Sequence, residues 1–190
     1  MRNLSFAAIV LAPALAAAQP APEKPAESAN SINISPLGVL FGDYAVTYEH
    51  LFEGQHGLIV EGTALRSAND DASQRQFGGA VGYRWHWRAR QNSGFLGVMV
   101  AQGLGTGEVE VNGMTHDMTV RSTTVTGNIG KRWMIGPANI TLRFGVGYGH
   151  YTADAKDNTA DAKMAEKLMN DLLAFLPIGF DGELSVGFVF

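Results

Sequence analysis

The chain has 190 residues, with 14 lysines and arginines against 18 aspartates and glutamates, and no cysteine. The missing cysteine excludes disulfides and thiolate chemistry, and a net charge of −4 gives no basic field that would gather a nucleic acid. Mean hydropathy is zero and no run of about 18 apolar residues occurs, which excludes a bundle of membrane helices. A transmembrane barrel stays open, because alternation along its strands averages the hydropathy.

The amino terminus has the pattern of a secretory signal peptide. A short cationic start around Arg2 precedes an apolar stretch over 4–15 that is too short to span a bilayer, and small residues follow it up to Ala18. We expect a signal peptide over 1–18, with a buried helix as the alternative. Residues 19–30 are rich in proline, alanine and charge and are expected to form a flexible periplasmic tether. The folded part is expected over 31–190.

The remaining sequence alternates with period two. In 76–88, one parity carries large apolar residues such as Phe77 and Trp85, while the other carries glycines and charges such as Arg84. The long, aromatic-rich pattern favours a barrel with lipid outside and a polar interior over a soluble sandwich. Each segment is close to or above the roughly 9 to 11 residues that a tilted membrane strand needs. Eight such segments are predicted as strands: 31–42, 43–52, 57–66, 76–88, 94–105, 119–135, 139–152 and 178–190.

The connections alternate between short and long. Those after the second, fourth and sixth strands are short, and those after the third, fifth and seventh are long, with a tight turn at 42–43 as the exception. Short periplasmic turns and long extracellular loops are typical of outer-membrane barrels. The sequence therefore predicts an all-β, eight-stranded antiparallel transmembrane β-barrel with both termini in the periplasm. The predicted short connections are 53–56, 89–93 and 136–138, and the long ones are 67–75, 106–118 and 153–177.

The last strand carries a more specific pattern, because apolar residues alternate up to a terminal aromatic: Leu184, Val186, Phe188 and Phe190. This segment resembles the last strand of bacterial outer-membrane barrels, and the resemblance implies that it is the signal read by the barrel-assembly machinery. In architecture the chain is most similar to small barrels of the OmpX and OmpA type. Its opening NISPLGVLFGDYAVTYEHLF and closing DGELSVGFVF resemble an uncharacterised family of bacterial outer-membrane barrels. The resemblance implies residence in the bacterial outer membrane, in contact with its lipid and lipopolysaccharide.

Charged residues on the inward parity are predicted to close the lumen. Four acids and four bases fall there, most of them three to five residues from the periplasmic ends of their strands: Glu49, Glu61, Asp181, Glu183, Arg84, Arg88, Arg132 and Arg143. An eight-stranded barrel is just wide enough for side chains to fill, and unpaired buried charges would be costly. We expect an ion network, with His86 as a member rather than a metal ligand. A general acid–base pair is the catalytic alternative, and no cofactor or metal is expected.

Outward-facing aromatic residues are predicted to form two interfacial girdles. One is periplasmic (Phe52, Trp85, Trp87, Trp133, Phe188, Phe190) and one is outer (Tyr44, Phe77, Tyr148). Arg121, near the upper rim, is expected either to pair with lipopolysaccharide phosphates or to be solvated. Asn69, Asp70 and Asp71 are interpreted as a polar turn, with a divalent cation site as the alternative.

The longest connection contains an amphipathic helical pattern. Asn158 or Thr159 can cap its start and Pro177 stops it. Its apolar stripe is expected to cap the barrel mouth, to lie in the outer leaflet or to dock a partner protein. The stripe consists of Met164, Leu168, Leu172 and Phe175, together with Met169 and Leu176.

An enzymatic alternative rests on His150 and Thr152, which share one face at the outer rim. The segment is similar to the His-Tyr-Ser of lipid A deacylases, in which a histidine activates a serine two positions away. Here threonine replaces that serine, and the nearby acid, Glu183, falls on the opposite face. His150 is therefore interpreted as a rim residue.

Together these patterns predict a non-enzymatic outer-membrane scaffold that presents its loops outward. A binding or adhesion module is the first alternative, using the helix or the acidic loop 107–117 to contact a host surface, an envelope protein or lipopolysaccharide. A narrow passive channel is a further alternative.

Overall fold

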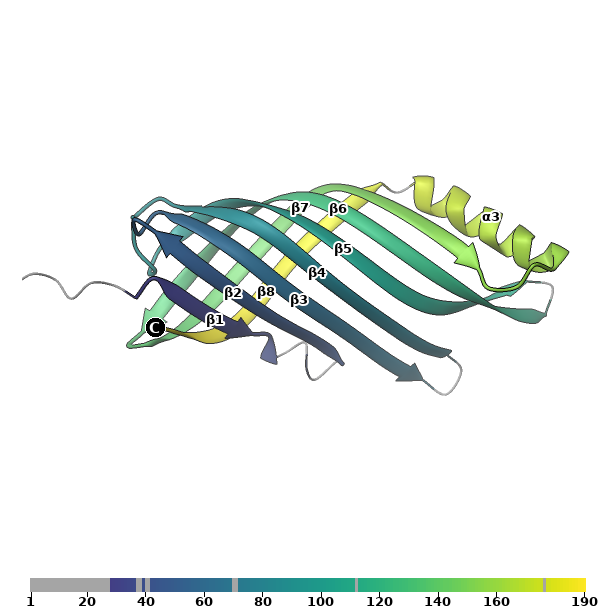
Figure 1. The fold of residues 1–190 in the computed structure, drawn as a ribbon, viewed down its shortest axis with the longest axis horizontal. Coiled ribbons are helices and arrows are strands. Elements are labelled where there is room, and N and C mark those ends of the chain that lie inside the picture. Colours follow the sequence, from purple (N-terminus) through teal and green to yellow (C-terminus); the bar gives the residue numbers. More distant parts are fainter. Residues whose placement is uncertain (1–27, 37–38, 40–41, 70–71, 112, 176) are drawn as a thin grey trace, which may run out of the picture.

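The computed structural model describes residues 28–190 except 37–38, 40–41, 70–71, 112 and 176. The expected signal peptide over 1–18, and the tether up to residue 27, lie outside the described residues. The all-β prediction is confirmed: eight antiparallel strands follow one another around a closed barrel, and the first pairs with the last (Figure 1). The strands are β1 Asn30–Ile34, β2 Asp43–Phe52, β3 His56–Asn69, β4 Ala72–His86, β5 Gly94–Val111, β6 Met114–Ile135, β7 Ala138–Ala155 and β8 Ile178–Val189.

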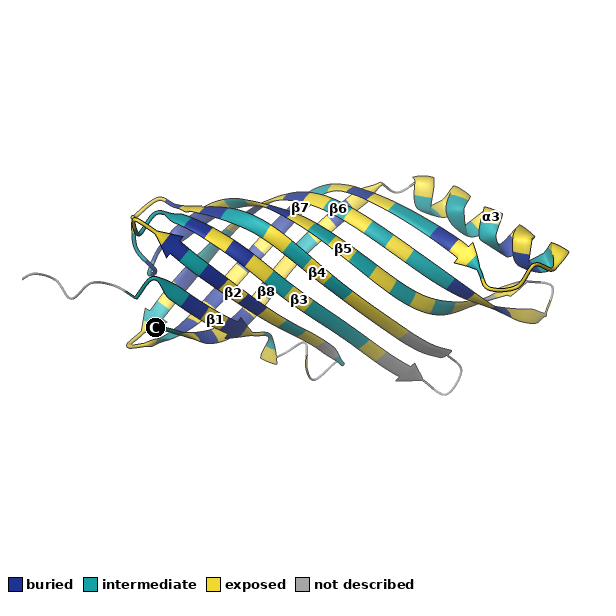
Figure 2. Cartoon of the chain, viewed as in Figure 1, coloured by how far each residue is buried: buried dark blue, intermediate teal, exposed yellow. Residues whose placement is uncertain are grey.

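The period-two sequence pattern appears directly in the burial of the strands. Figure 2 shows buried and exposed residues alternating along them. In β3, Ile59 is 2% exposed while its neighbour Val60 is 56% exposed, because successive side chains point to opposite faces. The charged residues Arg84 and Arg143 lie on the inner face. The barrel thus has many apolar side chains outside and many polar ones inside.

Two connections that the sequence predicted as long loops are strand. Within 67–75, β3 continues to Asn69 and β4 begins at Ala72, and within 106–118, β5 continues to Val111 and β6 begins at Met114. The extension of β5 and β6 has a physical cause, because Asn-Gly at 112–113 favours a two-residue hairpin turn. Gly113 has a φ of 76°. Asp70 and Asp71, which with Asn69 are interpreted as a polar turn or alternatively a divalent cation site, lie outside the described residues.

The first strand is shorter than predicted. The predicted strand 31–42 ends at Ile34, and the residues Pro36 and Val39 that follow it are helical. Ser35 followed by proline is a favourable helix start, and the Val39 N–H donates to the Ser35 carbonyl at 3.3 Å. The connection to β2 therefore covers 35–42, and the expected tight turn at 42–43 is wrong.

The helix α3 (Ala160–Phe175) lies between β7 and β8 and contacts β7, β5 and β6 (Figure 1). Thr159 caps it, since its Oγ1 accepts the Ala162 N–H at 3.2 Å. The packed face is small: Ala162 and Ala165 are fully buried. Four residues of the expected apolar stripe are instead 55 to 80% exposed and form no buried cap over the mouth: Met164, Leu168, Leu172 and Phe175. Met169 is partly exposed, and Leu176 lies outside the described residues.

α3 also covers an edge of the sheet. The β7–β8 ladder ends at Tyr148 opposite Ile178, so the rest of β7 has no β8 partner. Asn170 of α3 accepts the Ala153 N–H and donates to the Ala153 carbonyl, both at 2.8 Å. Glu166 accepts the Ala155 N–H at 3.1 Å. Helix side chains therefore replace a strand along this part of β7. Within the described residues, no helix is long and apolar enough to cross a membrane.

Candidate functional site: the lumen network

The strand register gathers charged side chains at one level of the lumen. Glu49 of β2 lies near Gly57 of β3, whose own partner in β4 is Arg84. Because Gly57 has no Cβ, the Glu49 carboxylate occupies the space that a side chain would take. We call the connected set the lumen network: Glu49, Glu61, Arg84, His86, Arg132, Arg143, Asp181 and Glu183.

Glu49 is the centre of the first half of this network. Its Oε2 accepts Arg84 Nη1 at 3.0 Å and Arg132 Nη2 at 2.6 Å, and its Oε1 lies 2.9 Å from His86 Nε2. All of these side chains are buried. One carboxylate therefore binds two guanidinium groups and an imidazole, using both of its oxygens.

Arg143 is the centre of the second half. Its Nη2 lies 2.8 Å from both Glu61 and Asp181, and its Nη1 lies 3.2 Å from Glu183. Arg84 joins the halves, because its Nη2 donates to Glu183 at 2.5 Å. The network then holds four carboxylates against three guanidinium groups and the His86 imidazole.

Arg88, predicted as a member, lies outside the network. Arg88 is exposed, and its backbone N–H donates to Ser93 Oγ at 3.1 Å. β4 ends at His86, so Arg88 belongs to the turn, where strand parity no longer directs a side chain inward.

Sequence reasoning missed several uncharged neighbours of the network. Gln91, buried in the β4–β5 turn, accepts a hydrogen bond from Arg132, and its amide donates to the Ser28 carbonyl at 3.1 Å. Asn33 of β1 lies within 3.1 Å of acceptors on Asn139, Thr141 and Ser185. The inward parity of Asn33 could have identified it, whereas a turn residue such as Gln91 carries no such signal.

The network fills the lumen at this level. Arg84 is 0% exposed and Arg132 is 1% exposed, whereas a water-filled passage would wet the side chains that line it. The Arg84 guanidinium also lies over the Phe95 ring, 4.4 Å from its centroid. Charges in such a site require close pairing, which the network supplies.

The residues of the enzymatic alternative are not assembled into a site. His150 and Thr152 lie on the outward face of β7 and are at least partly accessible. Glu183 lies inside, paired with Arg84 and Arg143. Among the described residues, no carboxylate pairs with His150, and no group of three or more histidines and acids is placed to hold a metal ion.

No family model matches the chain, and no curated protein matches it.

Proposed function

We propose that the protein is a non-enzymatic scaffold of the bacterial outer membrane, anchored by its barrel, closed by the lumen network and presenting its outer hairpins and α3 at the cell surface. One observation carries the proposal: large apolar side chains point away from the barrel on every strand. We call this set the apolar belt: Ile32, Ile34, Val46, Leu58, Val60, Val81, Leu96, Val98, Val100, Val125, Ile129, Ile140, Leu142, Phe144, Val146, Leu184 and Val186.

The apolar belt fits hydrocarbon and not water. Soluble monomers rarely expose contiguous apolar patches larger than a few hundred Å², and this belt runs around the whole barrel. The residues of both expected aromatic girdles are exposed beside it, among them Trp85, Trp133 and Tyr148. Tryptophan and tyrosine prefer the membrane interface, which supports this placement. Alternating β8 residues of the expected assembly signal, including Phe188, also face outward.

Heat-modifiability on gels, with conductance measured on the same sample in planar bilayers, tests the proposal. We expect the unheated and boiled protein to migrate differently and the inserted barrel to show no large, stable conductance. Identical migration would contradict the barrel in a membrane-like environment. Large conductance would contradict the closed lumen and favour the channel.

A surface binding module is the second candidate, supported by the exposed stripe of α3. A photo-crosslinker at Leu168 or Leu172 in intact cells tests it, with the exposed Lys167 as the matched control on the same helix. Repeated capture of one protein from the stripe, and not from Lys167, favours binding. Capture of lipid alone favours a role in anchoring.

A further inference from the structure

Two arginines face each other on the outside of the barrel. Arg66 of β3 and Arg75 of β4 are direct cross-strand partners, and both are exposed. Directly opposed residues have Cβ atoms about 5 Å apart, and like charges at that spacing destabilise a sheet. Among the described residues, no acid forms an ion pair with either arginine. The pair is therefore unfavourable unless an anion lies between the two side chains.

The arginine pair lies at the outer border of the apolar belt. The next outward pair toward the periplasm is Ala64 opposite Phe77, with Tyr44 beside Ala64. Tyr44, Ala64, Phe77 and the two arginines line one groove. Its floor is apolar and its outer end carries two positive charges, which is the polarity of an anionic lipid.

A second groove continues from Phe77 across β5 to β6. Leu104 of β5 has Phe77 as its partner on one side and Arg121 on the other. Phe77, Leu104 and Arg121 line this groove together, so a third cation borders the same apolar surface.

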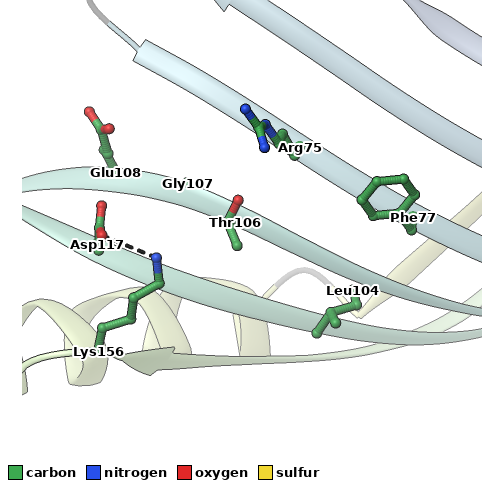
Figure 3. A pocket seen from close by; sticks show the side chains of 8 residues that line it. All are labelled: Arg75, Phe77, Leu104, Thr106, Gly107, Glu108, Asp117 and Lys156. Carbon is green, nitrogen blue, oxygen red and sulfur yellow. Dashed lines mark hydrogen bonds and ion pairs between the residues drawn. The ribbon is translucent and has the colours of Figure 1, made fainter.

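Among the described residues, the acids that line these grooves do not cancel the three arginine charges. Figure 3 shows Arg75 and Phe77 on one side of a neighbouring groove and Asp117 and Lys156 on the other. Asp117 is paired with Lys156 at 3.1 Å. Glu108 also lines this groove, so among the described residues that line the three grooves the acids are Glu108 and the already paired Asp117.

We propose that this surface binds a phosphorylated lipid of the outer leaflet. Arg66 and Arg75 hold its phosphate between their guanidinium groups, and its acyl chains lie over Phe77 and Leu104, with Arg121 as the third cation. The guanidinium fork suits a phosphate, which accepts two parallel hydrogen bonds from it. The proposal rests on the proposed membrane location and adds to it a defined lipid site.

Binding of lipid A tests the proposal. The full chain, folded in phosphatidylcholine vesicles, is titrated with bisphosphorylated lipid A and with dephosphorylated lipid A, and isothermal titration calorimetry reports binding. We expect at least about ten-fold preference for the phosphorylated form, lost in the double variant Arg66→Gln/Arg75→Gln. Arg88→Gln, at an exposed arginine in the turn that follows the opposite end of β4, is the matched control and keeps the preference.

The same double variant gives a second, independent readout. In neutral detergent without lipid A, removing the opposed charges is expected to raise the melting temperature, while added lipid A stabilises only the original chain. Equal preference in the double variant, or equal loss in Arg88→Gln, would overturn the proposal. Full competition by inorganic phosphate would assign the site to a free anion and overturn the lipid assignment.

Heat-modifiability of the protein in the same vesicles distinguishes the lipid site from the proposed outer-membrane location. A chain that inserts and folds but shows no preference contradicts the lipid site alone. A chain that fails to insert contradicts the membrane location on which the site depends.

Discussion

At the scale of single residues, Gly57 shows how the lumen network depends on a missing side chain. A Cβ at this position would collide with the Glu49 carboxylate. That carboxylate is held by Arg84, Arg132 and His86, so it cannot move without breaking their contacts. The constraint on residue 57 is therefore electrostatic as well as steric.

We expect Gly57→Ala to lower the free energy of unfolding by roughly 1–3 kcal/mol, the usual cost of overpacking. Urea titration in lipid vesicles, followed by tryptophan fluorescence, measures the change. Gly62→Ala is a matched control in the same strand, because nothing lies within 4 Å of a Cβ there. Equal stability of the two variants would show that Glu49 is not fixed in place.

Parity along the strands was enough to predict most of the lumen network. Glu49 and Arg143 could be placed inside because each lies within a long alternating segment. Arg88 could not, because two residues beyond the end of β4 the chain has already turned. The partners within the network were also beyond reach, since they depend on a register that the alternation alone does not give.

At the scale of elements, α3 acts as a cover for the edge of β7. Unpaired strand edges expose backbone donors and acceptors, and here Asn170 satisfies both groups of Ala153. The sequence predicted the helix and its cap at Thr159 but not its packed face. Large apolar residues suggest the packed face of a helix, whereas in the structure the small residues Ala162 and Ala165 allow α3 to approach the barrel closely.

We expect Asn170→Leu, which is similar in volume, to loosen α3 from the barrel. The Ala153 N–H and carbonyl would each lose their partner, and an unsatisfied buried polar group costs roughly 1–3 kcal/mol. Hydrogen exchange at the Ala153 amide should accelerate by about ten-fold or more. Lys167→Gln, exposed on the same helix, serves as the control. Unchanged exchange in the leucine variant would contradict the edge-covering role.

The contact of Glu166 with β7 should depend on pH. Hydrogen bonds from Lys163, and then from the Ala155 N–H, hold the pKa of this carboxyl below its usual value. A lowered pKa means that the contact contributes above the ordinary carboxyl pKa near 4.5 and is lost as pH falls through the lowered pKa. The Ala155 amide chemical shift measures this loss. It should titrate in the original chain and stay constant in Glu166→Gln; a titration that persists in this variant would assign the effect to another group.

At the scale of the whole molecule, the apolar belt determines whether the outer surface of the barrel is more stable in a bilayer or in water. We expect Val98→Arg, between Leu96 and Val100 in the apolar belt of β5, to reduce the free energy of folding into vesicles by roughly 2–4 kcal/mol, as arginine does near a bilayer midplane. Thr115→Arg faces outward on the neighbouring strand β6, beyond the belt and opposite Glu110, and should cost much less. Equal costs in urea titrations would argue against a bilayer around β5.

The same fold also shows the limit of pattern reasoning at this scale. Alternation identified the eight strands and their antiparallel order, because each short turn leaves only one neighbour available. The full lengths of the strands could not be predicted from the sequence, because the polar outer halves of β5 and β6 have the composition of loops. Only pairing, such as Glu108 opposite Asp117, shows that they are sheet.

Because β1 is short, the β1–β8 ladder that closes the barrel is the weakest pairing in the sheet. β1 has five residues, while β6 has 22, and its ladder with β8 extends only from Ser31 to Ile34. The β1–β2 ladder is nearly as short, from Asn30 to Ile34, whereas each of the other ladders holds ten or more pairs. Heat or denaturant should therefore separate the barrel beside β1 first. The barrel is therefore closed, but its strand pairing is not equally strong all around. Unfolding should begin with the separation of β1 from its neighbours.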